Sequence, residues 1–146
     1  MKKILFVFLL ILFTISFAQN SGLYSSNRIY EYGKYETPEL IKLKTEKYLQ
    51  NLIKSGYLIR KNEVTKSKID INLSLLNKGI EIAKTKIIYE FYDSGYSVFM
   101  YHPQMYFKEK KKWIYLKDDD ISLKKIIDVL EDIAYKDYQT EINSNF

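Results

Sequence analysis

Few residues in this 146-residue sequence could carry out chemistry. His102 is the single histidine, and the chain contains no cysteine. A nucleophile activated by His102 would therefore be a Ser, Thr or Tyr hydroxyl, and the sequence contains no G-x-S-x-G motif. Beside Pro103, at the end of an expected strand, His102 has an ordinary structural position. We predict no catalytic residues and no enzyme activity.

Acidic residues form two further candidate sites, and both lack the partners that such sites need. Asp118, Asp119 and Asp120 could offer oxygen ligands to Ca²⁺, but the D-x-D-x-D-G spacing of a calcium loop is missing. Acidic residues directly before a helix also match its dipole, which is the simpler interpretation. Glu90 has no second carboxylate for acid–base work, and Lys86 is its expected ion-pair partner. We predict no metal site and no cofactor.

A basic run from Lys108 to Lys112 precedes Trp113 and resembles a phosphate- or membrane-binding patch. At a hairpin tip, such charges usually keep a neighbouring apolar strand from aggregating. The formal charge is +5, but Lys2 and Lys3 belong to the N-terminal leader, so the remaining excess of basic residues is small. The sequence has no P-loop, dinucleotide-binding or zinc motif. We therefore predict no nucleic-acid binding.

Residues 1–18, MKKILFVFLLILFTISFA, have the organisation of a signal peptide. Two lysines precede an apolar run from Ile4 to Phe13, which is shorter than the roughly 20 residues that span a membrane. Ser16 and Ala18 are the small residues that a signal peptidase requires. We predict cleavage after Ala18, a periplasmic or secreted protein, and no stable membrane anchor. The alternative is a leader that is kept as an anchor.

Two segments have helical periodicity. Thr37 and Pro38 are typical of a helix start, and Gly56 is typical of a stop, so we predict a helix over 37–55. Its apolar stripe contains Ile41, Tyr48, Leu49, Leu52 and Ile53. A second helix is predicted at about 121–138, with a stripe of Leu123, Ile126, Ile127, Leu130, Ile133 and Ala134.

The residues between these helices predict antiparallel strands. Alternation is clearest from Lys68 to Leu76, with one apolar and one polar side. Asn62-Glu63 and Asn77-Lys78-Gly79 are expected turns. The apolar positions change parity between Ala83 and Lys86, which predicts a β-bulge because a straight strand has a side-chain period of two. Shorter strands are expected at 28–32, 57–61 and 113–116.

The segment from Thr85 to Phe107 is the strongest hairpin signal in the chain. We predict a three-residue loop, Asp93-Ser94-Gly95, with Gly95 in the left-handed conformation and Pro103 bending or ending the second strand. This register pairs Tyr92 with Tyr96, Tyr89 with Phe99, and Ile87 with Tyr101. The Tyr89–Phe99 side would lie under the helices, and we predict a partner surface on the other side, formed by Tyr92, Tyr96, Val98 and Met100. The competing interpretation is that the segment from Tyr24 to Tyr32 covers those four residues.

These segments predict an α+β domain over 28–138, with a flexible arm at 19–27 and a polar tail at 139–146. The expected architecture is a single antiparallel sheet of about four to six strands with two helices packed on one face. The leader end SFAQ, the helix start T-P-E-L, the strand IDINLSL and the hairpin IIYEFYDSGYSVFMY resemble an uncharacterised secreted bacterial domain family with a TBP-like fold. That resemblance covers about 28–137 and implies a helix–sheet–helix order, without any activity or site residue.

The function predicted from these observations is non-catalytic binding outside the cytoplasm. The sheet face opposite the helices would contact a protein or peptide of the cell envelope or the extracellular space. One alternative is a carrier that holds a small apolar ligand between the sheet and the helices. Another is an immunity or inhibitor protein that blocks a secreted enzyme with its charged hairpin tip.

Overall fold

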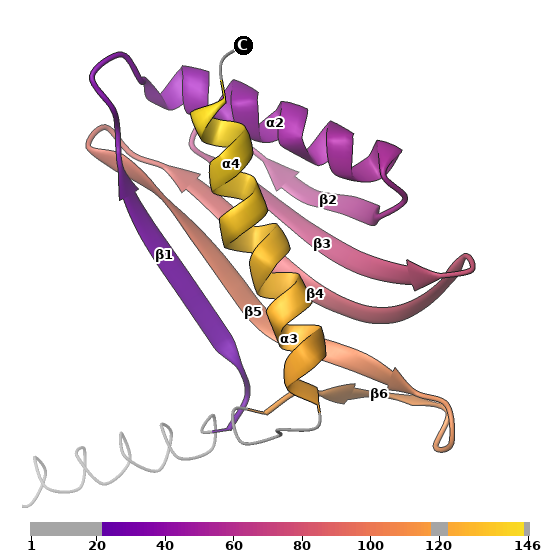
Figure 1. The fold of residues 1–146 in the computed structure, drawn as a ribbon. Coiled ribbons are helices and arrows are strands. Elements are labelled where there is room, and N and C mark those ends of the chain that lie inside the picture. Colours follow the sequence, from indigo (N-terminus) through magenta and orange to yellow (C-terminus); the bar gives the residue numbers. More distant parts are fainter. Residues whose placement is uncertain (1–21, 118–122, 145–146) are drawn as a thin grey trace, which may run out of the picture.

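Six strands form one antiparallel sheet, and two helices cover one of its faces (Figure 1). The computed structural model describes residues 22–117 and 123–144. Neighbouring strands follow the order β1-β5-β4-β3-β2, and β6 pairs with β5. The predicted α+β fold with a single antiparallel sheet is therefore confirmed. The strands are β1 (Ser25–Glu31), β2 (Leu58–Val64), β3 (Lys68–Asn77), β4 (Ile80–Phe91), β5 (Gly95–Phe107) and β6 (Lys112–Tyr115).

The first helix, α2 (Pro38–Lys54), begins as predicted, because the Thr37 side chain accepts a hydrogen bond from the Leu40 backbone N–H. The second is a continuous C-terminal helix in three parts, α3 (Lys124–Glu131), the π-helical turn η2 (Asp132–Lys136) and α4 (Asp137–Asn143). Within the described ranges, neither helix is long and apolar enough to cross a membrane. The predicted signal peptide, residues 19–21 of the arm, and Asp118–Asp120 lie outside those ranges.

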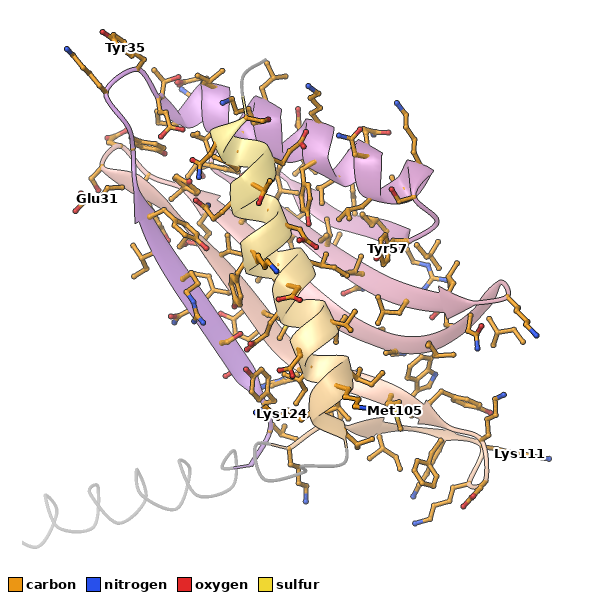
Figure 2. All side chains as sticks on the ribbon, in the orientation of Figure 1. Glu31, Tyr35, Tyr57, Met105, Lys111 and Lys124 are labelled. Carbon is orange, nitrogen blue, oxygen red and sulfur yellow. The ribbon has the colours of Figure 1, made fainter. Side chains whose placement is uncertain are left out.

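The hydrophobic core lies between the sheet and the helices, where side chains from both layers fill the space (Figure 2). β3 has the predicted alternation, because all four of its apolar odd-numbered residues are buried. The predicted stripe of α2 is also buried, except for Ile53. Side chains with no exposed surface include Ile41, Leu49, Ile69, Ile71, Leu73, Ile87, Tyr89, Leu130 and Tyr138.

The C-terminal helix continues to the end of α4 instead of stopping at Tyr138. The π turn adds one residue to the helical repeat, and this rotates α4 so that Tyr138 and Ile142 are both buried. The end of α4 is held by the Lys44 ammonium, which donates to the carbonyls of Ile142 (2.8 Å) and Ser144 (3.1 Å). The predicted polar tail at 139–146 is therefore wrong over the residues that α4 includes.

The β4–β5 hairpin has a different register from the predicted one. The Tyr92 N–H donates to the Gly95 carbonyl (2.8 Å), so the loop contains only Asp93 and Ser94. A register difference of one residue moves every side chain of β5 to the other face of the sheet. The predicted pairs of Tyr92, Tyr89 and Ile87 are therefore wrong, and the observed pairs are Phe91–Tyr96, Tyr89–Val98 and Ile87–Met100.

Gly95 is required for strand packing and does not supply a left-handed turn. Its φ is outside the left-handed region that Gly22, Gly56 and Gly79 adopt. A Cβ atom at Gly95 would lie 2.3 Å from the backbone carbonyl oxygen of Tyr30 in β1. Glycine is needed here because a distant segment of the chain approaches the backbone closely.

Two boundaries also differ from the predicted ones. β1 begins at Ser25, inside the arm predicted at 19–27, because Ser25 pairs with Tyr101 of β5. β2 runs through the predicted turn at Asn62-Glu63 and absorbs it as a register shift against β3. The chain turns after β2 instead, where the Thr65 N–H donates to the Lys68 carbonyl (2.8 Å).

Candidate functional site

Three of the four residues predicted as a partner surface belong to the core. Tyr96, Val98 and Met100 have exposed fractions of 3%, 0% and 0% and lie on the helix-covered side of β5. Tyr30 and Tyr32 stack on Tyr96, with ring centroids 5.0 and 5.7 Å away. The prediction of a partner surface is wrong for these three residues, and the register of the hairpin is the physical reason.

Tyr92, the fourth residue, stays at the surface with an exposed fraction of 48%. Its carbonyl accepts a hydrogen bond from the Tyr32 hydroxyl (2.6 Å), and its own hydroxyl donates to the Glu90 carboxylate. The predicted ion pair between Glu90 and Lys86 is not formed, because Lys86 pairs with Asp70 (3.2 Å). Tyr92 therefore does not form a surface patch with the other three residues, which are buried.

The open face, which we define as the sheet face opposite the helices, carries the other half of the strand residues. Both helices lie on the same side of the sheet, so neither covers this face (Figure 1). Ile29 of β1 has an exposed fraction of 78% there. The observed register also places on the open face Asn27, Asp70, Asn72, Lys86, Ile88, Phe99 and Tyr101.

Four rings form a continuous aromatic row along β5 and onto β6. The row consists of Phe99, Tyr101, His102 and Tyr115. Phe99 stacks on Tyr101 with ring centroids 5.9 Å apart and nearly parallel planes. His102 meets Tyr101 and Tyr115 edge to face, at 6.1 and 6.3 Å. Such ring pairs hold one another in position and leave one surface of the row free for contact.

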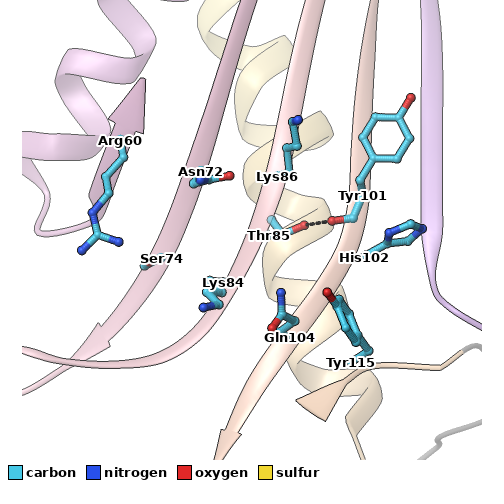
Figure 3. A pocket seen from close by; sticks show the side chains of 10 residues that line it. All are labelled: Arg60, Asn72, Ser74, Lys84, Thr85, Lys86, Tyr101, His102, Gln104 and Tyr115. Carbon is cyan, nitrogen blue, oxygen red and sulfur yellow. Dashed lines mark hydrogen bonds between the residues drawn. The ribbon is translucent and has the colours of Figure 1, made fainter. Parts of the chain in front are cut away.

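A β-bulge shapes the middle of the aromatic row. The register of β4 against β5 shifts between Lys84 and Lys86, inside the interval predicted for a bulge. The extra residue lies in β5, where His102 has a φ of 44°, so this shift does not change the parity of β4. The extra residue of β4 is Ile82, where the register against β3 shifts. The Thr85 hydroxyl donates to the Tyr101 carbonyl (2.9 Å) and bridges the two strands at this point (Figure 3).

Pro103 bends β5 without ending it, because the strand continues to Phe107. The Pro103 carbonyl accepts a hydrogen bond from the Leu116 N–H (2.8 Å), and the His102 N–H donates to the Tyr24 carbonyl (3.0 Å). The bulge thus joins the segments that precede β1 and follow β6. The backbone of His102 is structural, as predicted for this residue, while its ring is exposed in the aromatic row.

Three cations lie beside the aromatic row, and we call Arg60, Lys84 and Lys86 the basic group. Arg60 pairs with Glu81 (3.0 Å), and Lys86 pairs with the nearly buried Asp70. The Lys84 ammonium lies 4.0 Å from the centroid of the Trp113 ring. In the described part of the chain, no carboxylate lies within ion-pair distance of Lys84. A cation–π interaction attracts the ammonium group to the ring but does not neutralise its charge.

The aromatic row and the basic group border a polar hollow of about 330 Å³ (Figure 3). The C-terminal helix lies behind the sheet in this view, so the hollow opens on the side away from it. The lining comes from five strands, β2 to β6, and none of it is acidic. The lining residues are Arg60, Asn72, Ser74, Lys84, Thr85, Lys86, Tyr101, His102, Gln104 and Tyr115.

The hollow offers hydrogen-bond donors, positive charge and aromatic surface, which are groups for binding. Among the described residues, no three His, Asp or Glu side chains gather closely enough to hold a metal ion. The basic run at Lys108–Lys112 forms the tip of the β5–β6 hairpin, and Lys111 extends from that tip away from the helices (Figure 2). It is separate from the hollow.

The sequence contained one signal that would have located the aromatic row. A two-residue Asp93-Ser94 loop pairs Tyr89 with Val98, and this puts Phe99 and Tyr101 on the open face. The hollow itself had no such signal, because Arg60 reaches it from β2 and Tyr115 from β6. Only the complete strand order brings these strands to one region of the sheet.

The chain matches no protein-family model and no curated protein sequence. Among solved structures, it is similar to a TBP-like protein from Parabacteroides distasonis ATCC 8503, determined by crystallography at 1.90 Å resolution. The sequence identity is 14%, the TM-score is 0.43, and the match covers 84% of this chain and 93% of that one. The family that the sequence resembles is likewise described as having a TBP-like fold. The site described above rests on the residues of this chain alone.

Proposed function

We propose that this chain is an exported, non-catalytic binding domain that holds an extended segment of another protein on the open face of its sheet. The observation that carries the proposal is the aromatic row beside the basic group, on the face that no described helix covers. Aromatic side chains with polar edges are enriched at protein contact surfaces. A row of four is larger than the isolated apolar residues of an ordinary surface.

The rigidity of the row supports the same function. Phe99 and Tyr101 lie on a central strand that pairs with β1 on one side and β4 on the other. Their rings contact each other, and the backbone of Tyr101 is tied to Thr85. Such side chains lose little conformational freedom when a partner binds, so less of the interaction energy is spent on ordering the surface.

Binding on the open face is favoured over a carrier function between the layers. The region between the sheet and the helices contains the ring of Tyr138, whose centroid lies 5.5 Å from that of Tyr48 and 5.1 Å from that of Tyr89. These rings are buried, and Tyr138 contacts both of the others, so they fill the space that a small apolar ligand would need. We propose export because of the leader sequence. The binding partner of the chain should therefore be a protein of the cell envelope or of the extracellular space.

The test places a photo-crosslinking amino acid at Tyr101 on the open face and, as a control, at Val129 on the exposed side of α3. In cells that produce the chain, we expect one defined protein to be crosslinked from Tyr101 and not from Val129. That protein is then purified, and its affinity is measured by calorimetry against the wild type and Tyr101→Thr. Tyr101→Thr should lose most of the affinity at an unchanged melting temperature. Equal crosslinking from both positions, or equal affinity of both chains, would reject the proposal.

A further inference from the structure

We propose that the polar hollow binds carboxylates, so that the segment held on the open face is an acidic peptide. This inference rests on the proposed function and adds the chemistry of the partner. Three cations border the hollow, and all ten of its lining residues are neutral or basic. The lining also supplies the amide groups of Asn72 and Gln104 and the hydroxyls of Tyr101 and Tyr115. Ammonium, guanidinium, amide and hydroxyl groups all donate hydrogen bonds to a carboxylate.

Two sets of paired residues that run across neighbouring strands form most of the hollow, and each set continues from strand to strand without a gap. In one set Arg60 pairs with Asn72, Asn72 with Lys86, and Lys86 with Tyr101. The other set contains Ser74, Lys84, Gln104 and Tyr115, in that order across the sheet. The cations are therefore held at fixed positions on the strand ladder and are not carried by a loop.

Lys84 is the cation with the most capacity to bind a new anion. Arg60 and Lys86 are partly neutralised by Glu81 and Asp70, and those two carboxylates are themselves bonded to Ser74 and Asn62. Lys84 instead rests on the Trp113 ring, and no carboxylate of the described chain is within ion-pair distance of it. The ring shields one side of the ammonium from water, which strengthens its attraction for an anion on the other side.

The spacing of the cations favours an extended peptide as the source of the carboxylates. Lys84 and Lys86 are two residues apart on one strand and both line the hollow, so they are separated by a rise of roughly 6.6 Å. An extended peptide places its own alternate side chains at the same interval. Two Glu or Asp side chains of such a peptide can therefore meet both lysines, while its other side chains or backbone lie along the aromatic row.

The probe is a fluorescein-labelled octapeptide of alternating Glu and Thr, and its matched control has Gln in place of Glu. Fluorescence anisotropy at low salt should show binding of the Glu peptide and at least about tenfold weaker binding of the Gln peptide. Binding should weaken at about 0.3 M salt, because screening acts on exposed charges. Lys84→Gln should lose about tenfold in affinity, Lys84→Arg should retain most of it, and Lys136→Gln, on the helix layer, should behave as wild type.

Each other outcome would overturn the proposal. Equal affinity for the Glu and Gln peptides would show that binding does not depend on the charge of the carboxylates. Tighter binding of a single-stranded oligonucleotide of equal charge would assign the hollow to a phosphate polymer. If the crosslinked partner depends on Tyr101 but not on Lys84, the proposed function stands and the acidic-peptide inference falls. If it depends on neither residue, both fall. The melting temperature of Lys84→Gln, measured by circular dichroism, separates lost binding from lost folding.

Discussion

The two faces of the sheet use the same kinds of residue for opposite purposes. On the covered face, Tyr48 and Tyr138 are buried, and their hydroxyls bond to the Ile133 carbonyl (2.5 Å) and to the Thr45 hydroxyl (2.7 Å). On the open face, Phe99 and Tyr101 stack on each other, Tyr101 also meets the His102 ring, and both side chains stay partly exposed. Tyrosine therefore stabilises the interior where its hydroxyl finds a partner, and offers a contact surface where no second layer covers it.

The difference between the faces is decided by position along a strand and not by residue type. Val98 and Phe99 are neighbours on β5, yet Val98 has no exposed surface and Phe99 belongs to the aromatic row. A strand places successive side chains on opposite faces, so one residue of register exchanges core for surface.

The largest expected effect is the difference in stability between a lysine placed on the covered face and a lysine placed on the open face. Val98→Lys should lower the free energy of unfolding by about 4 kcal/mol or more, because an ammonium group would be buried without a partner. Phe99→Lys should change it by less than about 1 kcal/mol, because the new side chain can reach water. Urea denaturation of both variants measures the difference. Similar losses would mean that the faces are not distinct.

A smaller effect is expected from shortening an apolar side chain on the C-terminal helix. Leu130 has no exposed surface, so Leu130→Ala should cost about 2–5 kcal/mol through lost burial and a cavity. Its neighbour Val129 has an exposed fraction of 45%, and Val129→Ala should cost less than about 1 kcal/mol. Thermal unfolding followed by circular dichroism tests this. A matching loss at both positions would show that the helix does not dock through Leu130.

The smallest effect concerns alkaline pH. Burial raises the pKa of Tyr138 above its usual value, and burial also raises the pKa of Tyr30, to about 12. The unfolded chain ionises first, near pH 10, so stability is complete below that pH and decreases as the pH rises above it. At about pH 11, Tyr138 alone should account for a loss of about 1.4 kcal/mol. Urea titrations across this range should show a shallower decrease for Tyr138→Phe. An identical pH dependence of both chains would contradict this assignment.

Much of the fold could be predicted because its signals are local. The Thr37 cap and the alternation from Lys68 are each readable within a few residues, and each appears in the structure. The end of α4 could not be read in this way, because the π turn at η2 changes the helical repeat on which the prediction depends.

The candidate site was missed because its position depends on contacts between distant segments. The residues next to Gly95 in the sequence suggest a turn. Glycine is required at this position for another reason, because the Tyr30 carbonyl in β1 leaves no space for a Cβ atom. Assigning Gly95 to the loop shifted β5 by one residue, which placed Val98 outside and Tyr101 inside. The cations of the hollow come from β2 and β4, and no sequence pattern connects Arg60 with Lys84.

The position of β1 has a consequence for the order in which the chain acquires its structure. Ser25 pairs with Tyr101, so the first of the described strands to leave the ribosome must wait for one of the last before it can pair. The β3–β4–β5 meander has tight loops and can form from contacts that are short in sequence, which close at a lower entropic cost. Folding should therefore begin in the meander and finish when β1 closes the edge.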